Sequence, residues 1–181
     1  MTALVALWLL VSDPFVVGAY AEQSVVVAAP VERVWEYYSN LQNFTRFYPG
    51  IVDVHRLDSN TSMWTFEISP PLSSAIRTTY RLTEQKNPDG GVVFRTDAAE
   101  RDFMECRAIA EPLTSSSTRV TVSLALRMTR EHARDFHWLA PIVGAAFISG
   151  QMKKQIADDL EKFLQESSNN LTQMPSVRHG E

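Results

Sequence analysis

The chain has 181 residues, of which 45% are hydrophobic and 21% charged, and this composition is typical of one globular domain with a sizeable core. The formal net charge of −4, without any run of basic residues, argues against nucleic acid as a partner and gives no strong membrane-surface signal. Cys106 is the only cysteine, which excludes an internal disulfide and a cysteine-ligated metal cluster. We interpret Cys106 as a small buried residue, with a reactive thiol as the less favoured alternative.

The N-terminal segment leaves two interpretations open. An apolar run covers residues 3–11, and the tripeptide at 19–21 fits the small-x-small pattern of a signal-peptidase site. No Lys or Arg precedes the run, and the run is too short to span a bilayer. We therefore expect residues 1–21 to be either an export signal or an N-terminal extension, which makes the location either exported or cytoplasmic.

The next segment predicts a strand followed by two short helices. A β-branched run over residues 23–30 ends at Pro30, which is well placed to open a helix. Ser39 and Asn40 end that helix and can cap a second one, which Pro49 and Gly50 terminate. Tyr37 and Tyr48 are expected near the edges of the two helices. The apolar faces are predicted to contain Val31, Val34, Trp35, Tyr38, Leu41, Phe44 and Phe47.

Six further strands are predicted from alternating apolar and polar residues, over 51–58, 62–69, 74–85, 91–97, 101–110 and 118–129. Strands at such short spacing pair antiparallel, because parallel pairs need long crossovers. One face of the sheet should be solvated and should carry Arg77, Arg81, Arg95, Glu105, Arg107 and Arg127. The covered face should carry Trp64, Phe66, Ile68, Ile76, Thr78, Tyr80, Leu82, Val92, Phe94, Met104, Cys106, Ala108, Ala110, Val120, Val122, Leu124, Leu126 and Met128.

A long helix is predicted from about Leu139 to Gln165. Its second half has one apolar face, whereas its first half is apolar on nearly every side. The first half also contains Pro141, Gly144 and Gly150, so we expect it to be buried or to face a cavity, and to bend. Residues 168–181 are predicted to form a disordered polar tail.

The order of these elements is the helix-grip arrangement, and the opening residues resemble the START-like superfamily. The resemblance is to the branch labelled polyketide cyclase/dehydrase or SRPBCC, it covers residues 23–166, and the segment 150–165 is similar to the last helix of that family. It implies an α+β, Bet v 1-like domain over residues 22–167, in which a curved antiparallel seven-stranded sheet wraps around the C-terminal helix. The matching positions are Ala29, Pro30, Val34, Trp35, Ser39, Asn40, Phe47, Pro49 and Gly50.

The resemblance also implies a cavity for a hydrophobic small molecule that is lipid-, sterol- or polyketide-like. Tyr80 is the best single candidate for orienting a ligand carbonyl or for acid–base chemistry, the alternative being a core tyrosine bonded to backbone. The aromatic residues around Trp138 either gate the cavity mouth or pack on the sheet. The predicted lining residues are Trp35, Trp64, Phe66, Ile76, Thr78, Tyr80, Phe94, Met104, Val122, Leu124, Trp138, Val143 and Phe147.

No catalytic motif accompanies this pattern. There is no nucleotide-binding glycine loop and no nucleophile elbow, and the spacing of His132 and His137 does not suit a metal, so neither metal nor cofactor is expected. A carrier or sensor of a hydrophobic molecule is therefore the favoured hypothesis. A small cyclase or dehydratase that uses Tyr80, and a protein-interaction module on the same fold, are the alternatives. The sequence does not predict the identity of the ligand or the oligomeric state.

Overall fold

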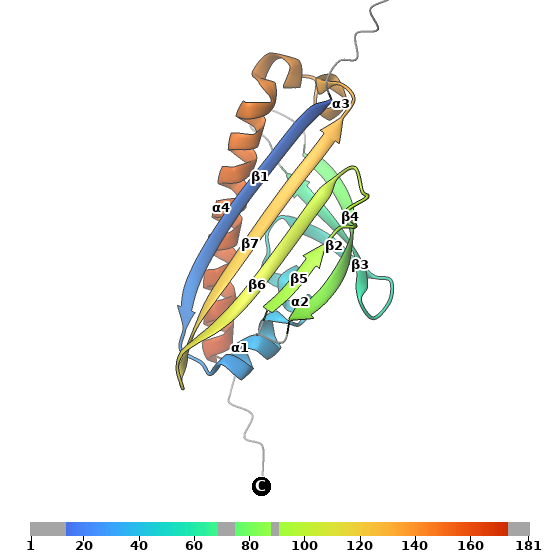
Figure 1. Ribbon diagram of the computed structural model, residues 1–181. Helices are drawn as coiled ribbons and strands as arrows, with labels where there is room; N and C mark the ends of the chain where they lie inside the picture. Colours follow the sequence, from blue (N-terminus) through green and yellow to red (C-terminus); the bar gives the residue numbers. More distant parts are fainter. Residues whose placement is uncertain (1–13, 69–74, 88–90, 174–181) are drawn as a thin grey trace, which may run out of the picture.

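A strongly curved antiparallel sheet of seven strands organises the chain, in the order β1-β7-β6-β5-β4-β3-β2 (Figure 1). The computed structural model describes residues 14–68, 75–87 and 91–173. The elements are β1 (Phe15–Val27), α1 (Val31–Tyr38), α2 (Leu41–Phe47), β2 (Ile51–Arg56), β3 (Thr61–Ile68), β4 (Ile76–Asn87), β5 (Gly91–Arg95), β6 (Phe103–Thr114), β7 (Ser117–Arg130), α3 (Ala133–Phe136) and α4 (Ala140–Gln173). The predicted helix-grip fold is confirmed.

The two faces of the sheet differ as the alternation predicts. The concave face is apolar, and Trp64, Phe94 and Met104 on it are wholly inaccessible to solvent. The convex face is charged, and an ion pair between Arg77 and Glu67, with 2.8 Å between nitrogen and oxygen, lies on it. The arginines predicted to be solvated are exposed. The side chain of Ile68, predicted for the concave face, lies outside the described part of the chain.

The first strand begins earlier than predicted. β1 starts at Phe15 and pairs with β7 along its whole length, from Phe15 opposite Arg130 to Val27 opposite Thr118. Val17 and Ala21 are buried on the same face as Val27, so residues 15–21 are part of the sheet and precede the boundary predicted at residue 22. β-branched and aromatic residues in this segment favour a strand. Residues 1–13 lie outside the described residues.

The last helix ends later than predicted. α4 continues to Gln173, so residues 168–173 are helical rather than part of a disordered tail. Leu171 is 1% exposed, and its carbonyl oxygen accepts a hydrogen bond of 2.8 Å from Nη2 of Arg33. These contacts with α1 supply the stabilisation that a polar helix end lacks by itself. Residues 174–181, the rest of the predicted tail, lie outside the described residues.

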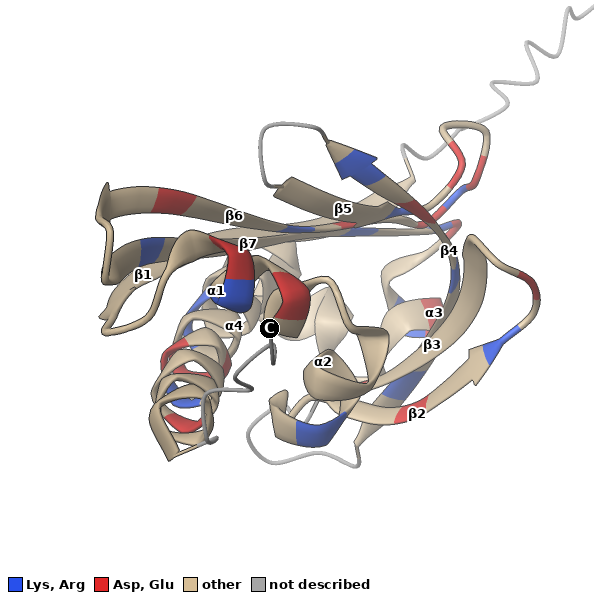
Figure 2. Ribbon diagram, turned by 90° about the horizontal axis from the view of Figure 1, so that it is seen from below, with Lys and Arg blue, Asp and Glu red and all other residues tan. Residues whose placement is uncertain are grey.

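A cluster of aromatic rings fills the end of the grip that holds α1 and α2. Figure 2 is viewed from this end and shows the sheet curving around α2, with α4 on one side and β2 and β3 on the other. The ring centroid of Phe44 on α2 lies 5.1 Å from that of Phe163 on α4 and 5.6 Å from that of Phe94 on β5. Trp64 stands 5.0 Å from Phe94. Because these rings pack against one another, this end of the grip is closed core.

Three rings of the opening segment lie differently from the prediction. Tyr37 and Tyr48, expected at helix edges, are each 5% exposed, whereas Trp35 is only half-buried. α1 presents Val34, Tyr37 and Tyr38 inward, a face rotated from the predicted one. The helix spans only eight residues, so the elements that pack against it rather than helical periodicity decide which residues are covered.

Candidate ligand-binding site

The packing becomes looser at the other end of the grip, where α3 and the start of α4 lie (Figure 1). Ile76 and Thr78 on β4 belong to the concave face but are only partly buried there. Phe136 of α3 and Ile148 of α4 are also partly buried against the core. Interior side chains are therefore fully buried at the α1 end and only partly buried at the α3 end, which we call the open end of the grip.

Tyr80 carries the most conspicuous polar group on the concave face. The residue is 3% exposed, and its ring stands edge-on to Phe66 with 6.1 Å between the centroids. Its hydroxyl group is buried and has no hydrogen-bond partner among the described residues. Burial raises the pKa of this phenol above its ordinary value, an effect that nearby Asp102 increases and Arg130 decreases. The hydroxyl is therefore protonated near neutral pH and can donate a hydrogen bond.

An ion pair lies close to Tyr80. Nη1 of Arg130, at the end of β7, donates to both carboxylate oxygens of Asp102 at 2.8 Å. The backbone N–H of Thr129 donates to the same carboxylate at 2.9 Å. Both charged side chains are about a quarter exposed. These bonds fix the segment before β6 against the end of β7 and thereby hold one wall of the open end in place.

A contact between β4 and β7 crosses the grip at this level. Oγ1 of Thr78 lies 3.6 Å from Sδ of Met128, although β5 and β6 separate the two strands in the sheet order. β5 ends at Arg95 and β6 begins only at Phe103. Beyond these two ends, β4 and β7 can therefore approach each other. The contact sets the width of the interior beside Tyr80.

His137 is a second buried polar group, on the connection between α3 and α4. Its Nδ1 accepts a hydrogen bond of 3.2 Å from the backbone N–H of Leu139. In the neutral ring this assignment leaves the proton on Nε2, which is buried and has no partner among the described residues. His137 therefore offers a second N–H donor. No periodic pattern singles out this residue, because it lies between two helices.

The predicted lining residues fall into three groups. Phe66, Ile76, Thr78 and Tyr80 lie on the walls toward the open end. Trp35 is half-buried on α1. Buried in the closed core or on the adjoining strands are Trp64, Phe94, Met104, Val122 and Leu124. Trp138, Val143 and Phe147 are on the surface, with 69%, 39% and 52% of each residue exposed. The structure therefore does not place these last three inside the grip.

A small internal space lies between α4 and the sheet near its middle. Its volume is about 20 Å³, which is room for about one water molecule. Tyr48, Phe66, Met152 and Asp159 are among its lining residues. Burial raises the pKa of the Asp159 carboxyl group above its ordinary value. The space is too small for an organic ligand in this conformation.

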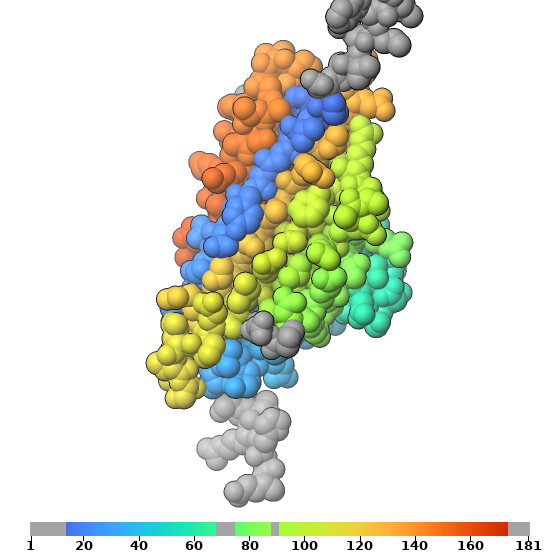
Figure 3. Space-filling model, in the orientation of Figure 1, coloured from blue at the N-terminus to red at the C-terminus, as the bar shows by residue number. Residues whose placement is uncertain are grey.

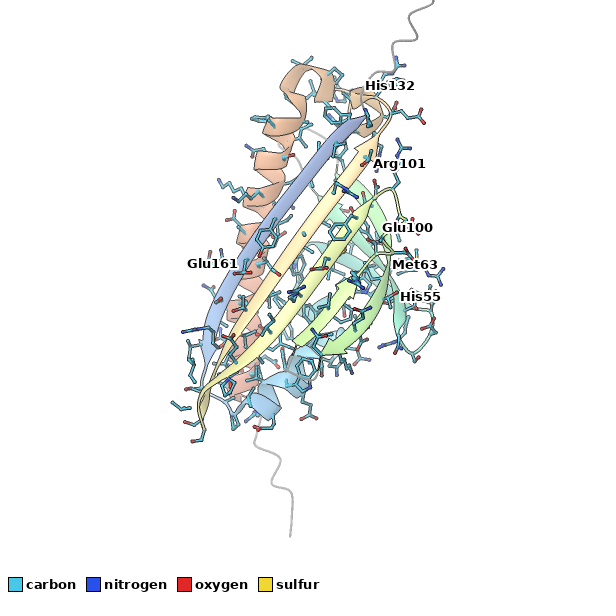
Figure 4. All side chains as sticks on the ribbon, in the orientation of Figure 1. His55, Met63, Glu100, Arg101, His132 and Glu161 are labelled. Carbon is cyan, nitrogen blue, oxygen red and sulfur yellow. The ribbon has the colours of Figure 1, made fainter. Side chains whose placement is uncertain are left out.

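The histidines do not form a metal centre in the part of the chain that the structure describes. His55 is exposed on β2, and His132 caps the start of α3 at the opposite end of the molecule from α1 (Figure 4). No group of three or more His, Cys, Asp or Glu side chains in the described ranges is arranged to hold a metal ion. None of the described helices is both long enough and apolar enough to cross a membrane.

Comparisons with known proteins agree with this geometry. The family model described as "Polyketide cyclase / dehydrase and lipid transport" matches residues 19–167. Among solved structures, the Zhui aromatase/cyclase from Streptomyces sp. R1128 is similar with a TM-score of 0.66 and 15% identity, over 91% of this chain and 99% of that one. A START superfamily protein from Mycobacterium smegmatis has a TM-score of 0.60 and 16% identity, over 84% of this chain and 98% of that one.

A further solved structure, a protein from Deinococcus radiodurans, has a TM-score of 0.56 and 19% identity, over 84% of this chain and 98% of that one. At these identities the likenesses establish the fold. No curated protein matches the chain by sequence.

Proposed function

This chain belongs to the polyketide cyclase/dehydrase and lipid-transport family of the START superfamily, and from that premise we propose that it carries or senses a hydrophobic small molecule. The ligand would be lipid-, sterol- or polyketide-like and would enter the grip at the α3 end. The single observation that supports this most is the buried hydroxyl group of Tyr80, which has no partner among the described residues. A buried polar group without a partner costs about 1–3 kcal/mol, and a ligand carbonyl or hydroxyl would recover that cost.

The chemistry of the open end narrows the ligand class. Besides the Asp102–Arg130 ion pair, the polar groups described toward this end are those of Tyr80, Thr78 and His137. The concave face is otherwise apolar, so most of the ligand surface must be apolar. Tyr80 and His137 both offer hydrogen-bond donors, which favours a ligand that carries an acceptor oxygen. A ketone, ester or carboxylic acid on an apolar body satisfies both conditions.

Extraction of the natively purified protein with organic solvent, followed by mass spectrometry, tests the proposal directly. We expect a stoichiometric hydrophobic molecule that contains oxygen. Binding of a fatty acid and of an anthraquinone, measured by quenching of tryptophan fluorescence, extends the test to a protein that is purified empty. A protein that yields no ligand and binds neither probe would overturn the proposal.

Tyr80→Phe and Tyr37→Phe form a matched pair for the same assay. The hydroxyl of Tyr37 is also buried without a partner in the described structure, but it lies on α1 at the closed end, where its ring packs against Tyr38 at 5.3 Å. Loss of one ligand hydrogen bond should weaken probe binding by about five- to tenfold in Tyr80→Phe. The Tyr37→Phe variant should bind as the unsubstituted protein does. An equal effect of both substitutions would exclude a direct contact with Tyr80.

A small cyclase or dehydratase is the second candidate, and the buried, unpartnered groups of Tyr80 and His137 favour it. A phenol and an imidazole are groups that can donate and accept protons during ring closure or loss of water. Incubation with a short poly-β-ketone thioester should then give a product lighter by one water. In that case Tyr80→Phe should lower kcat more than it raises KM, whereas a carrier would give no turnover.

A further inference from the structure

Large apolar side chains are exposed at the α3 end of the molecule. We call Trp138, Ile142, Val143 and Phe147 the apolar tip; they are 69%, 77%, 39% and 52% exposed. All of them lie within residues 138–147, at the start of α4. Figure 3 shows that these first turns of α4 (orange) lie at the same end of the molecule as the beginning of β1 (dark blue). Single exposed apolar residues are ordinary, but a group of large ones in one short segment marks a contact surface.

A break in α4 accounts for the exposure of Ile142 and Val143. Gly144 has φ of 78° and ψ of 160°, which interrupts the helix after its first turn. Beyond the break α4 runs alongside β1, and Oγ of Ser149 accepts a hydrogen bond of 3.1 Å from the backbone N–H of Gly18 (Figure 1). The turn that carries Ile142 and Val143 does not continue the axis of the packed part of the helix. Its side chains therefore remain outside the core.

The segment that carries the apolar tip has a basic charge balance. Between Phe136 and Ala157 the sequence contains no acidic residue, and its only charged residues there are Lys153 and Lys154, both exposed. The exposed carboxylates of Glu131 and Asp135 come before this segment, next to α3 and on it. Tryptophan prefers the boundary between water and hydrocarbon, and lysines beyond an apolar surface can reach lipid phosphates.

We propose that the apolar tip docks onto the surface of a phospholipid bilayer, so that the open end of the grip faces the membrane. The docking itself does not depend on the proposed ligand, although a membrane-facing entrance would suit a ligand that partitions into lipid. Trp138, Ile142 and Phe147 enter the interfacial layer, and Lys153 and Lys154 remain at the level of the phosphates.

Vesicle flotation with the full-length chain tests this proposal. We expect the protein to float with phosphatidylcholine vesicles, and more strongly when phosphatidylglycerol is included. The triple variant Trp138→Ser, Ile142→Ser and Phe147→Ser should bind at least about tenfold more weakly, because three large apolar side chains no longer enter the lipid. The fluorescence of Trp138 should shift to shorter wavelength on binding.

A matched control removes the same kind of side chain elsewhere. Val26, Leu57 and Leu113 are 56%, 47% and 44% exposed, on β1, after β2 and on β6. Their triple replacement by serine should leave vesicle binding unchanged. Circular dichroism of both variants establishes that they fold. Equal losses in both triple variants, or no flotation of the unsubstituted protein, would overturn the proposal.

Three further outcomes separate the alternatives. If the tip variant floats as well as the unsubstituted chain, residues 3–11 alone carry the binding and the proposal is wrong. It is also wrong if the protein does not float and light scattering shows a dimer that the tip substitutions abolish. Ligand extraction is independent of both results: an empty protein that floats contradicts only the proposed ligand, and a loaded protein that does not float contradicts only the docking.

Discussion

The hydroxyl oxygens of Tyr38 and Ser167 lie 2.6 Å apart in the interior, where they join the first helix to the end of the last one. Ser167 also donates to the carbonyl oxygen of Leu164 at 3.2 Å, so in that arrangement it accepts from Tyr38. Burial raises the pKa of Tyr38 to about 12, and the bond to Ser167 opposes part of that rise. This pair closes the α1 end of the grip, in contrast to the unpartnered Tyr80 hydroxyl toward the other end.

Ser167→Ala should destabilise the protein by about 1–3 kcal/mol, because it leaves the Tyr38 hydroxyl buried without a partner. Urea denaturation followed by circular dichroism measures the change. Ser168→Ala, one position along at a partly exposed site, is the control and should change stability by less than about 0.5 kcal/mol. Tyr38→Phe completes a double-mutant cycle, and additive effects of the two substitutions would show that the hydroxyls are not coupled.

Gly144→Ala and Gly150→Ala should have opposite effects. A Cβ atom at either position would meet no atom within 4 Å, so space is not the constraint. Gly144 has positive φ, in a region that L-residues adopt at a cost of about 1–3 kcal/mol, whereas Gly150 lies in the helical part of α4. We expect thermal unfolding to show destabilisation for Gly144→Ala and stabilisation of up to about 1 kcal/mol for Gly150→Ala. Stabilisation by both substitutions would mean that α4 can straighten at Gly144.

Asp159→Asn should stabilise the protein at neutral pH and have little effect in acid. Burial raises the folded-state pKa of Asp159 above its unfolded value, and Lys162 offsets this only in part. Between those two pKa values the native state binds more protons than the unfolded state, so this group makes stability fall as the pH rises. Above both values the folded protein bears the full cost of the buried charge.

Denaturant unfolding of Asp159→Asn across the acid-to-neutral range measures this difference. Glu161→Gln is the control for loss of one negative charge, since Glu161 projects outward from α4 (Figure 4). A gain in stability for Asp159→Asn that is the same at every pH would contradict the assignment.

The thiol of Cys106 should be inert in the native protein. Cys106 is 3% exposed on β6, and burial raises its pKa to about 12, so almost no thiolate is present at neutral pH. We expect negligible reaction with Ellman's reagent under native conditions and one equivalent of reaction in denaturant. Rapid native labelling would revive the alternative of a reactive thiol.

Sequence patterning predicted the sheet well, because strand periodicity is a local property. The alternation along β4 and β7 places Tyr80 and Leu124 on the concave face and Arg81 and Arg127 on the convex one, as the structure confirms. Cys106 was likewise predicted to be buried from its position in an alternating strand. The helix-grip order followed from the spacing of turns and the proline and glycine signals.

The ends of the strands and helices, and the choice of which helical side chains are buried, depended on tertiary contacts. β1 extends back to Phe15 because β7 offers a partner along its whole length, and α4 extends to Gln173 because α1 covers Leu171. For the same reason Tyr37 and Tyr48 are buried, and Trp35 is only half-buried, contrary to prediction. The side of a short helix that is covered depends on what packs against it.

In the candidate site, too, the direction of a side chain followed from local sequence, whereas its contacts depended on distant segments. The sequence alone determined that Tyr80 points to the covered face, because side chains alternate along a strand irrespective of what covers them. Only the tertiary structure decided that its hydroxyl lacks a partner, that His137 offers a second donor, and that Trp138 and Phe147 face solvent rather than the interior. Those properties depend on which atoms arrive from distant segments, and on the break at Gly144, and no local pattern of residues specifies them.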